Sequence, residues 1–176
     1  SSFTILLIVF FLFKEAGGLF NTPATEEGYV LAVNKSNDVG KLSPEKIMDI
    51  FDGNITNWKD ISGMDQDILI FRFSDLTNYY TEEELGDEFQ YVPQKISELV
   101  AKEPGIIAFF PKQYLLENGF QGKVLPEEKI TLGEFFGGTK WYPTSTPAPI
   151  FGLIPLLLGT LLVSIGAIVL LSLIHI

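Results

Sequence analysis

The chain has 176 residues, of which 47% are hydrophobic, and it carries a formal net charge of −10. A surface this acidic repels the phosphate backbone of nucleic acid, so we expect no nucleic-acid partner. Cysteine is absent and histidine occurs once, which excludes disulfides and thiolate chemistry and leaves few ligands for a metal. Because the sequence offers no Ser/His/Asp or Cys/His arrangement, we expect neither an enzyme nor a bound cofactor.

The first hydrophobic run opens the chain. Residues 3–13 read FTILLIVFFLF, and the first charge is Lys14. At the rise of an α-helix this run is too short to cross a bilayer. It also lacks the basic residues that precede the core of a signal peptide. We therefore expect residues 1–20 to be a transmembrane helix whose beginning is missing.

Residues 21–125 alternate between strand and helix patterns. Apolar runs at 28–34 (GYVLAVN), 68–73 (ILIFRF) and 105–110 (GIIAFF) predict buried strands, and residues 93–102 predict an amphipathic helix. Strands that alternate with helices predict a three-layer α/β domain with a largely parallel sheet. The length suffices for one lobe with a single small core.

The stretch SPEKIMDIF predicts a further helix after the first strand. Ser43 suits the N-cap, Pro44 suits the first helical position, and Gly53 follows the end. Helical spacing then places one set of apolar residues on the inner face of this helix and another on that of the later helix: Ile47, Ile50 and Phe51, and Ile96, Leu99 and Val100.

A juxtamembrane segment, residues 126–149, precedes the second hydrophobic run. Thr131 and Glu134 have the spacing of a capping box ahead of two phenylalanines, which predicts a short amphipathic helix close to the membrane. We expect the indole of Trp141 to lie at the level of the lipid headgroups.

Residues 150–170 are long and apolar enough to cross a bilayer as a second transmembrane helix. Glycines recur in it at every seventh position, at 152, 159 and 166. Such a smooth side favours close packing against other membrane helices.

Two resemblances bear on function. The stretch LSPEKIMDIFDGNITNWKDISGMDQDILIF, together with VAKEPGIIAFFP, resembles the periplasmic phosphate-binding protein family. The stretch GEFFGGTKWYPTSTPAPIFGLIPLLLGTLLVSIGAIVL is similar to the permease subunit of phosphate ABC transporters, and FLFKEA is similar to the end of that permease's first helix. Together they imply an extracytoplasmic α/β domain, a periplasmic-binding-protein-like lobe, inserted between two transmembrane helices of a permease.

The permease resemblance also implies partners and a location. A second permease subunit, an ATPase subunit and a soluble phosphate-binding protein would assemble with the chain, and membrane lipid would surround its helices. The location would be the cell inner membrane, in a multi-pass protein with residues 21–149 on the extracytoplasmic side. The alternative is a membrane-tethered receptor for phosphate or another anion, or a docking module for a soluble binding protein.

The binding-protein resemblance points to an anion site after the second strand, in FRFSDLTNYYTEEELGDEF. Arg72, Ser74 and Thr77 offer donors for an anion. However, the loop lacks the glycines of the family's phosphate-binding loop, and the acidic residues 82–84 repel a dianion. We therefore expect that the inserted domain no longer binds phosphate itself, and that Arg72 forms an ion pair with an acidic neighbour. We interpret the acidic residues 82–88 as a solvated face and not as a cation site.

The last residues, LSLIHI, resemble the translated end of a sequencing-library adapter. We accordingly expect residues 171–176 to be foreign to the protein and assign no role to His175.

Overall fold

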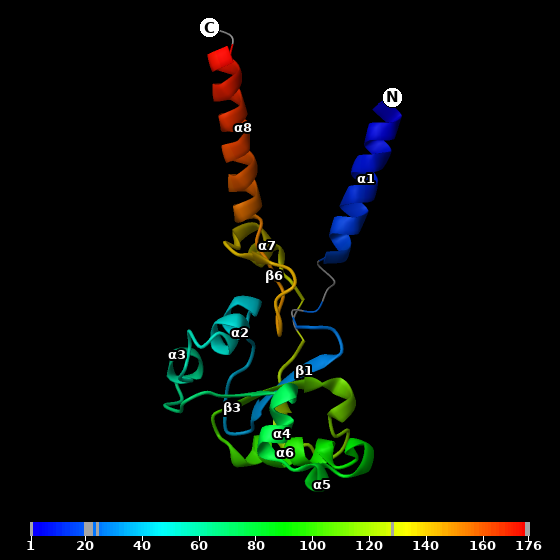
Figure 1. Ribbon diagram of the computed structural model, residues 1–176, viewed down its shortest axis with the longest axis vertical. Coiled ribbons are helices and arrows are strands. Elements are labelled where there is room, and N and C mark those ends of the chain that lie inside the picture. The colour runs from blue at the N-terminus through cyan, green and yellow to red at the C-terminus, as the bar shows by residue number, and fades with distance from the viewer. Residues whose placement is uncertain (1, 20–22, 24, 128, 175–176) are drawn as a thin grey trace. The chain divides into compact units, whose positions relative to one another are not determined.

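The computed structural model describes residues 2–19, 23, 25–127 and 129–174 (Figure 1). Contacts within the chain divide it into two units. The first, which we call the sheet unit, comprises Ala24–Glu128 and Thr146–Ala148. The second, the flanking unit, comprises Ser1–Pro23, Lys129–Ser145 and Pro149–Ile176.

The sheet unit is built on a four-stranded sheet with the order β2-β3-β1-β4. The strands are β1 (Tyr29–Asn34), β2 (Leu69–Arg72), β3 (Ile106–Pro111) and β4 (Gly122–Val124). Strand β2 runs parallel to β3, whereas β1 is antiparallel to both β3 and β4. The expectation of a largely parallel sheet is therefore wrong. Apolar runs identify buried strands but do not fix their direction.

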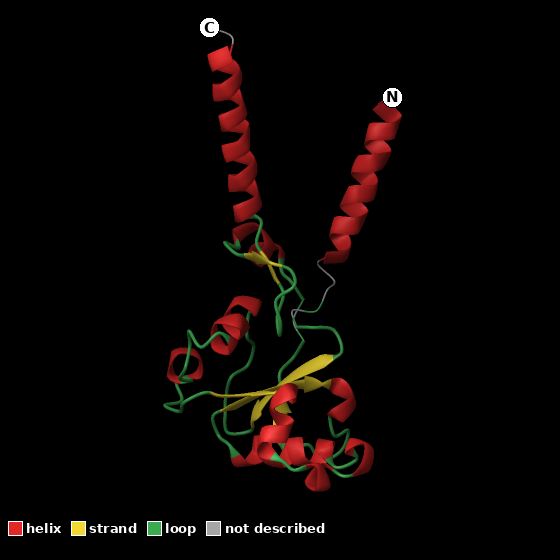
Figure 2. Ribbon diagram, viewed as in Figure 1, coloured by secondary structure: helices red, strands yellow, loops and turns green. Residues whose placement is uncertain are grey.

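Both faces of the sheet are covered, as the alternation of strands and helices predicts (Figure 2). Because successive side chains of a strand point to opposite faces, β1 and β3 each contribute to two hydrophobic clusters. One cluster includes Val30, Ala32, Ile106 and Ala108 and packs against helix α6 (Val92–Lys102). The other includes Leu31, Val33, Ile107 and Phe109 and packs against helix α2 (Pro44–Phe51).

Local signals place α2 where the sequence predicts it. The Ser43 side chain accepts a hydrogen bond from the backbone N–H of Lys46, and Pro44 is the first helical residue. Ile47, Ile50 and Phe51 are buried, as are Ile96, Leu99 and Val100 of α6. The helix ends at Phe51 with Asp52 as its C-cap, and Gly53 then adopts a φ of 76°, which glycine tolerates best.

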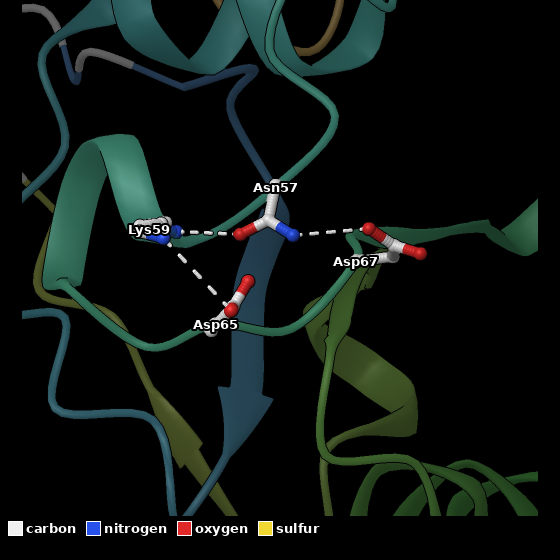
Figure 3. A network of polar contacts seen from close by, with 4 residues as sticks. All are labelled: Asn57, Lys59, Asp65 and Asp67. Carbon is white, nitrogen blue, oxygen red and sulfur yellow. Dashed lines mark hydrogen bonds and ion pairs between the residues drawn. The ribbon is translucent and has the colours of Figure 1, made fainter.

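The turn after α2 carries Trp58, which is fully buried. Its indole Nε1–H donates to the carbonyl of Gly105 at 2.8 Å. Beside it, the Asn57 side chain accepts from the N–H of Lys59 and donates to the carboxylate of Asp67, and the Lys59 ammonium lies 3.9 Å from Asp65 (Figure 3). These contacts connect the short helix α3 (Lys59–Ser62) to the segment that leads into β2.

Short helical turns fill the remaining connections of the sheet unit: η1 (Phe73–Asp75), α4 (Leu76–Tyr79), α5 (Glu82–Leu85), η2 (Asp87–Phe89) and η3 (Lys112–Tyr114). The two ends of the sheet unit meet, because the N–H of Glu26 donates to the carbonyl of Pro147 at 2.9 Å.

The flanking unit contains helices α1 (Ser2–Leu19), α7 (Leu132–Gly137) and α8 (Ile154–Ile174) and the paired strands β5 (Trp141–Tyr142) and β6 (Ile150–Phe151). The predicted capping box of α7 is confirmed, since Thr131 accepts from the N–H of Glu134 and the Glu134 carboxylate accepts from the N–H of Thr131.

The start of the C-terminal helix differs from the expectation of residue 150. Ile150 and Phe151 pair with β5, and α8 begins only at Ile154. Hydropathy did not reveal this boundary, because an apolar strand and an apolar helix have similar composition. At the other end α8 continues to Ile174, through part of the adapter-like stretch, while His175 lies outside the described residues.

Within the described part of the chain, α8 is the one helix that satisfies the length and composition criteria for crossing a membrane. The structure thus supports the second of the two predicted membrane helices, and these criteria do not identify the truncated first one, predicted at residues 1–20.

Candidate anion-binding pocket

An open pocket of about 270 Å³ lies in the sheet unit. It is close to the carboxyl ends of the parallel strands β2 and β3, where open α/β sheets commonly bind ligands. Its lining residues are Glu26, Tyr29, Arg72, Phe73, Ser74, Phe109 and Thr146. Two of the three predicted anion-binding residues, Arg72 and Ser74, thus meet at one pocket.

Arg72 is the last residue of β2, and its guanidinium is held in place by the end of α2. Its Nη2 donates to the carbonyl of Phe51 at 2.9 Å, and its central carbon lies 5.1 Å from the centre of the Phe51 ring. A cation is favourable at the C-terminus of a helix and over an aromatic face. The expected ion pair is therefore replaced, among the described residues, by a carbonyl and a ring.

Asp75 occupies donors that an anion would use. Its carboxylate accepts from the backbone N–H of Arg72 at 3.2 Å and from the Ser74 hydroxyl at 3.4 Å. Glu26 adds a second carboxylate to the pocket lining. The electrostatic attraction of Arg72 for an anion is consequently opposed by two nearby negative charges.

Thr77, the third predicted residue, lies on α4 with an exposed side chain and is not among the residues that line this pocket. The structure therefore does not bring it together with Arg72 and Ser74.

The acidic stretch after Thr77 has a structural role at α5. Thr81 and Glu84 form a capping box, in which the Glu84 carboxylate accepts from the N–H and the hydroxyl of Thr81. The hydrogen bond from the Thr81 backbone, followed by that from its hydroxyl, lowers the pKa of Glu84. Among the described residues, no cluster of three or more acidic, histidine or cysteine side chains is placed to hold a metal.

Sequence reasoning missed the aromatic part of the pocket. Tyr29 and Phe109 stack with ring centres 4.7 Å apart, and Phe73 stacks on Tyr114 at 4.8 Å. These side chains come from β1, β3 and η1, and Thr146 comes from a distant segment. Nothing in the local sequence pattern indicates that they share a pocket.

A mixed α/β sheet covered on both faces, with a pocket at the strand ends, is typical of the class of α/β domains that bind small ligands. The family model described as "PBP superfamily domain" matches residues 10–158. The chain therefore belongs to the PBP (periplasmic-binding-protein-like) superfamily.

Two solved structures are similar to the chain. One is an ABC-type phosphate transport receptor from Vibrio cholerae, with 23% identity, a TM-score of 0.43 and coverage of 62% of this chain and 50% of the other. The second is a putative phosphate ABC transporter substrate-binding protein with bound phosphate from Clostridium perfringens, with 23% identity, a TM-score of 0.40 and coverage of 59% and 46%. The chain thus spans about half the length of these binding proteins.

Proposed function

We propose that the chain is a membrane-tethered receptor domain for phosphate or a similar oxyanion, working in an ABC-type import system. The observation that carries this proposal is the pocket that joins the Arg72 guanidinium and the Ser74 hydroxyl at the strand ends of a PBP-superfamily domain. Guanidinium and hydroxyl groups are the usual donors for an oxyanion.

The geometry favours weak binding. One guanidinium nitrogen, Nη2, is already bonded to Phe51, which orients the group and leaves the others for a ligand. Asp75 and Glu26 oppose the incoming negative charge. We therefore propose a site of millimolar affinity, suited to an extracytoplasmic domain that samples its ligand and does not retain it.

The tether in this proposal is α8. This helix has 21 residues, and its exposed side chains are almost entirely apolar, which fits a helix surrounded by lipid. The sheet unit would then lie on the extracytoplasmic side of the inner membrane, together with the rest of residues 21–149.

A second candidate function rests on a different observation, the similarity of residues 133–170 to the permease subunit of phosphate ABC transporters. In that case the sheet unit is an insertion into a multi-pass permease, and α8 contributes to a translocation path. The partners would be a second permease subunit, an ATPase subunit and a soluble phosphate-binding protein, for which the sheet unit would serve as a docking module.

The two candidates differ in what the parent gene encodes beyond Val169. Further membrane helices with a cytoplasmic coupling loop favour the permease, and a stop codon favours the tethered receptor. Co-purification of an ATPase subunit with the protein in mild detergent tests the same difference.

Binding of inorganic phosphate to the full chain in detergent, measured by titration calorimetry, tests the receptor function. We expect millimolar binding, which Arg72→Ala weakens about tenfold or more because it removes a charged donor. Lys102→Ala, which removes a positive charge at the exposed end of α6, serves as the control and leaves binding unchanged. Absence of any binding by the parent chain would contradict the proposal.

A further inference from the structure

The first backbone N–H groups of α8 are hydrogen-bonded to the segment that precedes the helix. The first N–H groups of a helix have no partner within the helix and normally bind water. Here the N–H of Leu153 donates to the carbonyl of Phe135 at 2.8 Å, and that of Ile154 donates to the carbonyl of Gly138 at 3.3 Å. Helix α7 and the residue after it therefore supply acceptors for the start of α8.

The remaining donors of this turn are also accounted for. Pro155 has no N–H, and the N–H groups of Leu156 and Leu157 both donate to the carbonyl of Leu153 at 3.1 Å. No N–H between Leu153 and Leu157 depends on water. A helix that starts within the apolar part of a bilayer needs these bonds, because no water is present there to satisfy a free backbone N–H.

Two glycines allow the backbones to come this close. A Cβ on Gly138 would lie 2.6 Å from the Cα of Gly152, and a Cβ on Gly152 would lie 2.4 Å from the carbonyl of Gly138. The N–H of Gly152 donates to the carbonyl of Lys140 at 2.8 Å. This contact fixes α7 and the β5–β6 pair to the start of α8 as one piece.

The same piece exposes large apolar side chains. Leu132 and Phe136 of α7 are 60% and 59% exposed, and Tyr142 of β5 is 59% exposed. Neighbouring rings are partnered, since Phe135 contacts Phe136 and Trp141 contacts Phe151. These exposed side chains precede α8 in the chain. The apolar residues of α8 are themselves exposed along its length.

We propose that residues 131–145 and 149–153, all of the flanking unit, form an interfacial cap, seated at the boundary between lipid headgroups and acyl chains, with Leu132, Phe136 and Tyr142 against lipid. The occupant of this apolar surface is the bilayer that holds α8. The bonded start of α8 then lies below the headgroups without a loss of hydrogen bonds. This inference rests on the part of the proposed function in which α8 is the membrane tether, and it does not depend on the anion pocket.

The test uses the absence of native cysteine, which permits single labels. Phe136→Cys and, separately, Ile165→Cys are labelled with an environment-sensitive fluorophore, and each full chain is placed in lipid nanodiscs. The nanodisc lipids carry a nitroxide either close to the headgroup or near the end of the acyl chain. We expect the label at 136 to be quenched by the shallow nitroxide and the label at 165 by the deep one.

A matched pair of variants tests the glycine contact. Gly138→Ala forces the cap away from α8, whereas a Cβ on the adjacent Gly137 meets nothing within 4 Å. We expect Gly138→Ala to abolish most of the shallow quenching at position 136 and Gly137→Ala to preserve it.

Two outcomes overturn the inference and can be told apart. If the label at 165 is quenched and the label at 136 is not, α8 is inserted and the cap is in water. If neither label is quenched, α8 is not inserted, so both the tether and the cap are wrong. Phosphate titration of the same labelled chains reports separately on the anion pocket.

Discussion

At the residue scale, Asp75 is the side chain that we expect to affect the proposed anion site most. Its carboxylate accepts from the Arg72 N–H and the Ser74 hydroxyl, in the place where an oxyanion would accept. Arg72 and Ser74 were proposed as anion-binding residues from the sequence because arginine and serine after a strand resemble a known binding loop. Whether the Asp75 charge opposes that of Arg72 depends on the direction of the Asp75 side chain, which the sequence pattern did not reveal.

Asp75→Ala should increase the affinity for phosphate. Removal of the carboxylate releases two donors and eliminates a charge whose repulsion is worth on the order of 1 kcal/mol, so we expect about a fivefold lower Kd. Titration calorimetry of the full chain measures the change. Asp52→Ala, at the exposed end of α2, is the control for a general loss of negative charge. An equal gain in both variants would show that net charge, and not the local donors, is responsible.

Trp58→Phe should destabilise the sheet unit by about 2–4 kcal/mol, because it leaves a cavity and removes a buried hydrogen-bond donor to Gly105. Urea unfolding of the full chain in detergent, followed by circular dichroism, measures this. Trp141→Phe is the matched control, since that indole is only partly buried and its ring contacts Phe151. A loss in Trp141→Phe as large as in Trp58→Phe would contradict the role given to the buried indole.

At the element scale, the helices were predicted more accurately than the sheet. Ser43, Pro44 and the spacing of the apolar residues are local signals, and α2 forms where they indicate. The direction of β1 relative to β3 depends on long-range packing, and β4 has only three residues, so neither was predicted. Strands β5 and β6, with two residues each, lie inside stretches that were assigned to the juxtamembrane segment and to a membrane helix.

The junction of α3, β2 and β3 depends on Gly105. Its carbonyl accepts from both the Leu69 N–H and the Trp58 indole, and a Cβ at this position would lie 2.0 Å from the carbonyl oxygen of Asp67. We expect Gly105→Ala to cost about 2–3 kcal/mol in the free energy of unfolding. Gly40→Ala is the control, because a Cβ there meets nothing within 4 Å. Equal midpoints in urea for these two variants would contradict the close approach.

At the scale of the whole molecule, the PBP-superfamily match extends over residues 10–158 and so includes parts of both units. The sequence predicted the soluble α/β domain and the C-terminal membrane helix from hydropathy and period. It did not reveal that Thr146–Ala148 belong to the sheet unit, because this contact joins segments that are distant in the chain.

The sheet unit should lie on the extracytoplasmic side. The distribution of charged residues does not predict this orientation, because the positive-inside rule does not apply to loops longer than about 60 residues. Asn54→Cys, in the exposed turn after α2, should react with a membrane-impermeant thiol reagent on spheroplasts, and the parent chain, which has no cysteine, should not react. Reaction at position 54 only after lysis would reverse the assigned orientation.

The positions of the two ends of the sheet unit determine how it responds to a pulling force. The chain enters through β1 and leaves through β4, which are adjacent and antiparallel, and Glu26 is bonded to Pro147 where the two ends meet. A force transmitted through the two flanks therefore pulls on the same end of two neighbouring strands. Because the ladder hydrogen bonds lie across these strands, such a force breaks them one after another. If both flanks are pulled, the domain should open from its β1–β4 edge at low force, while β2 and β3 remain paired.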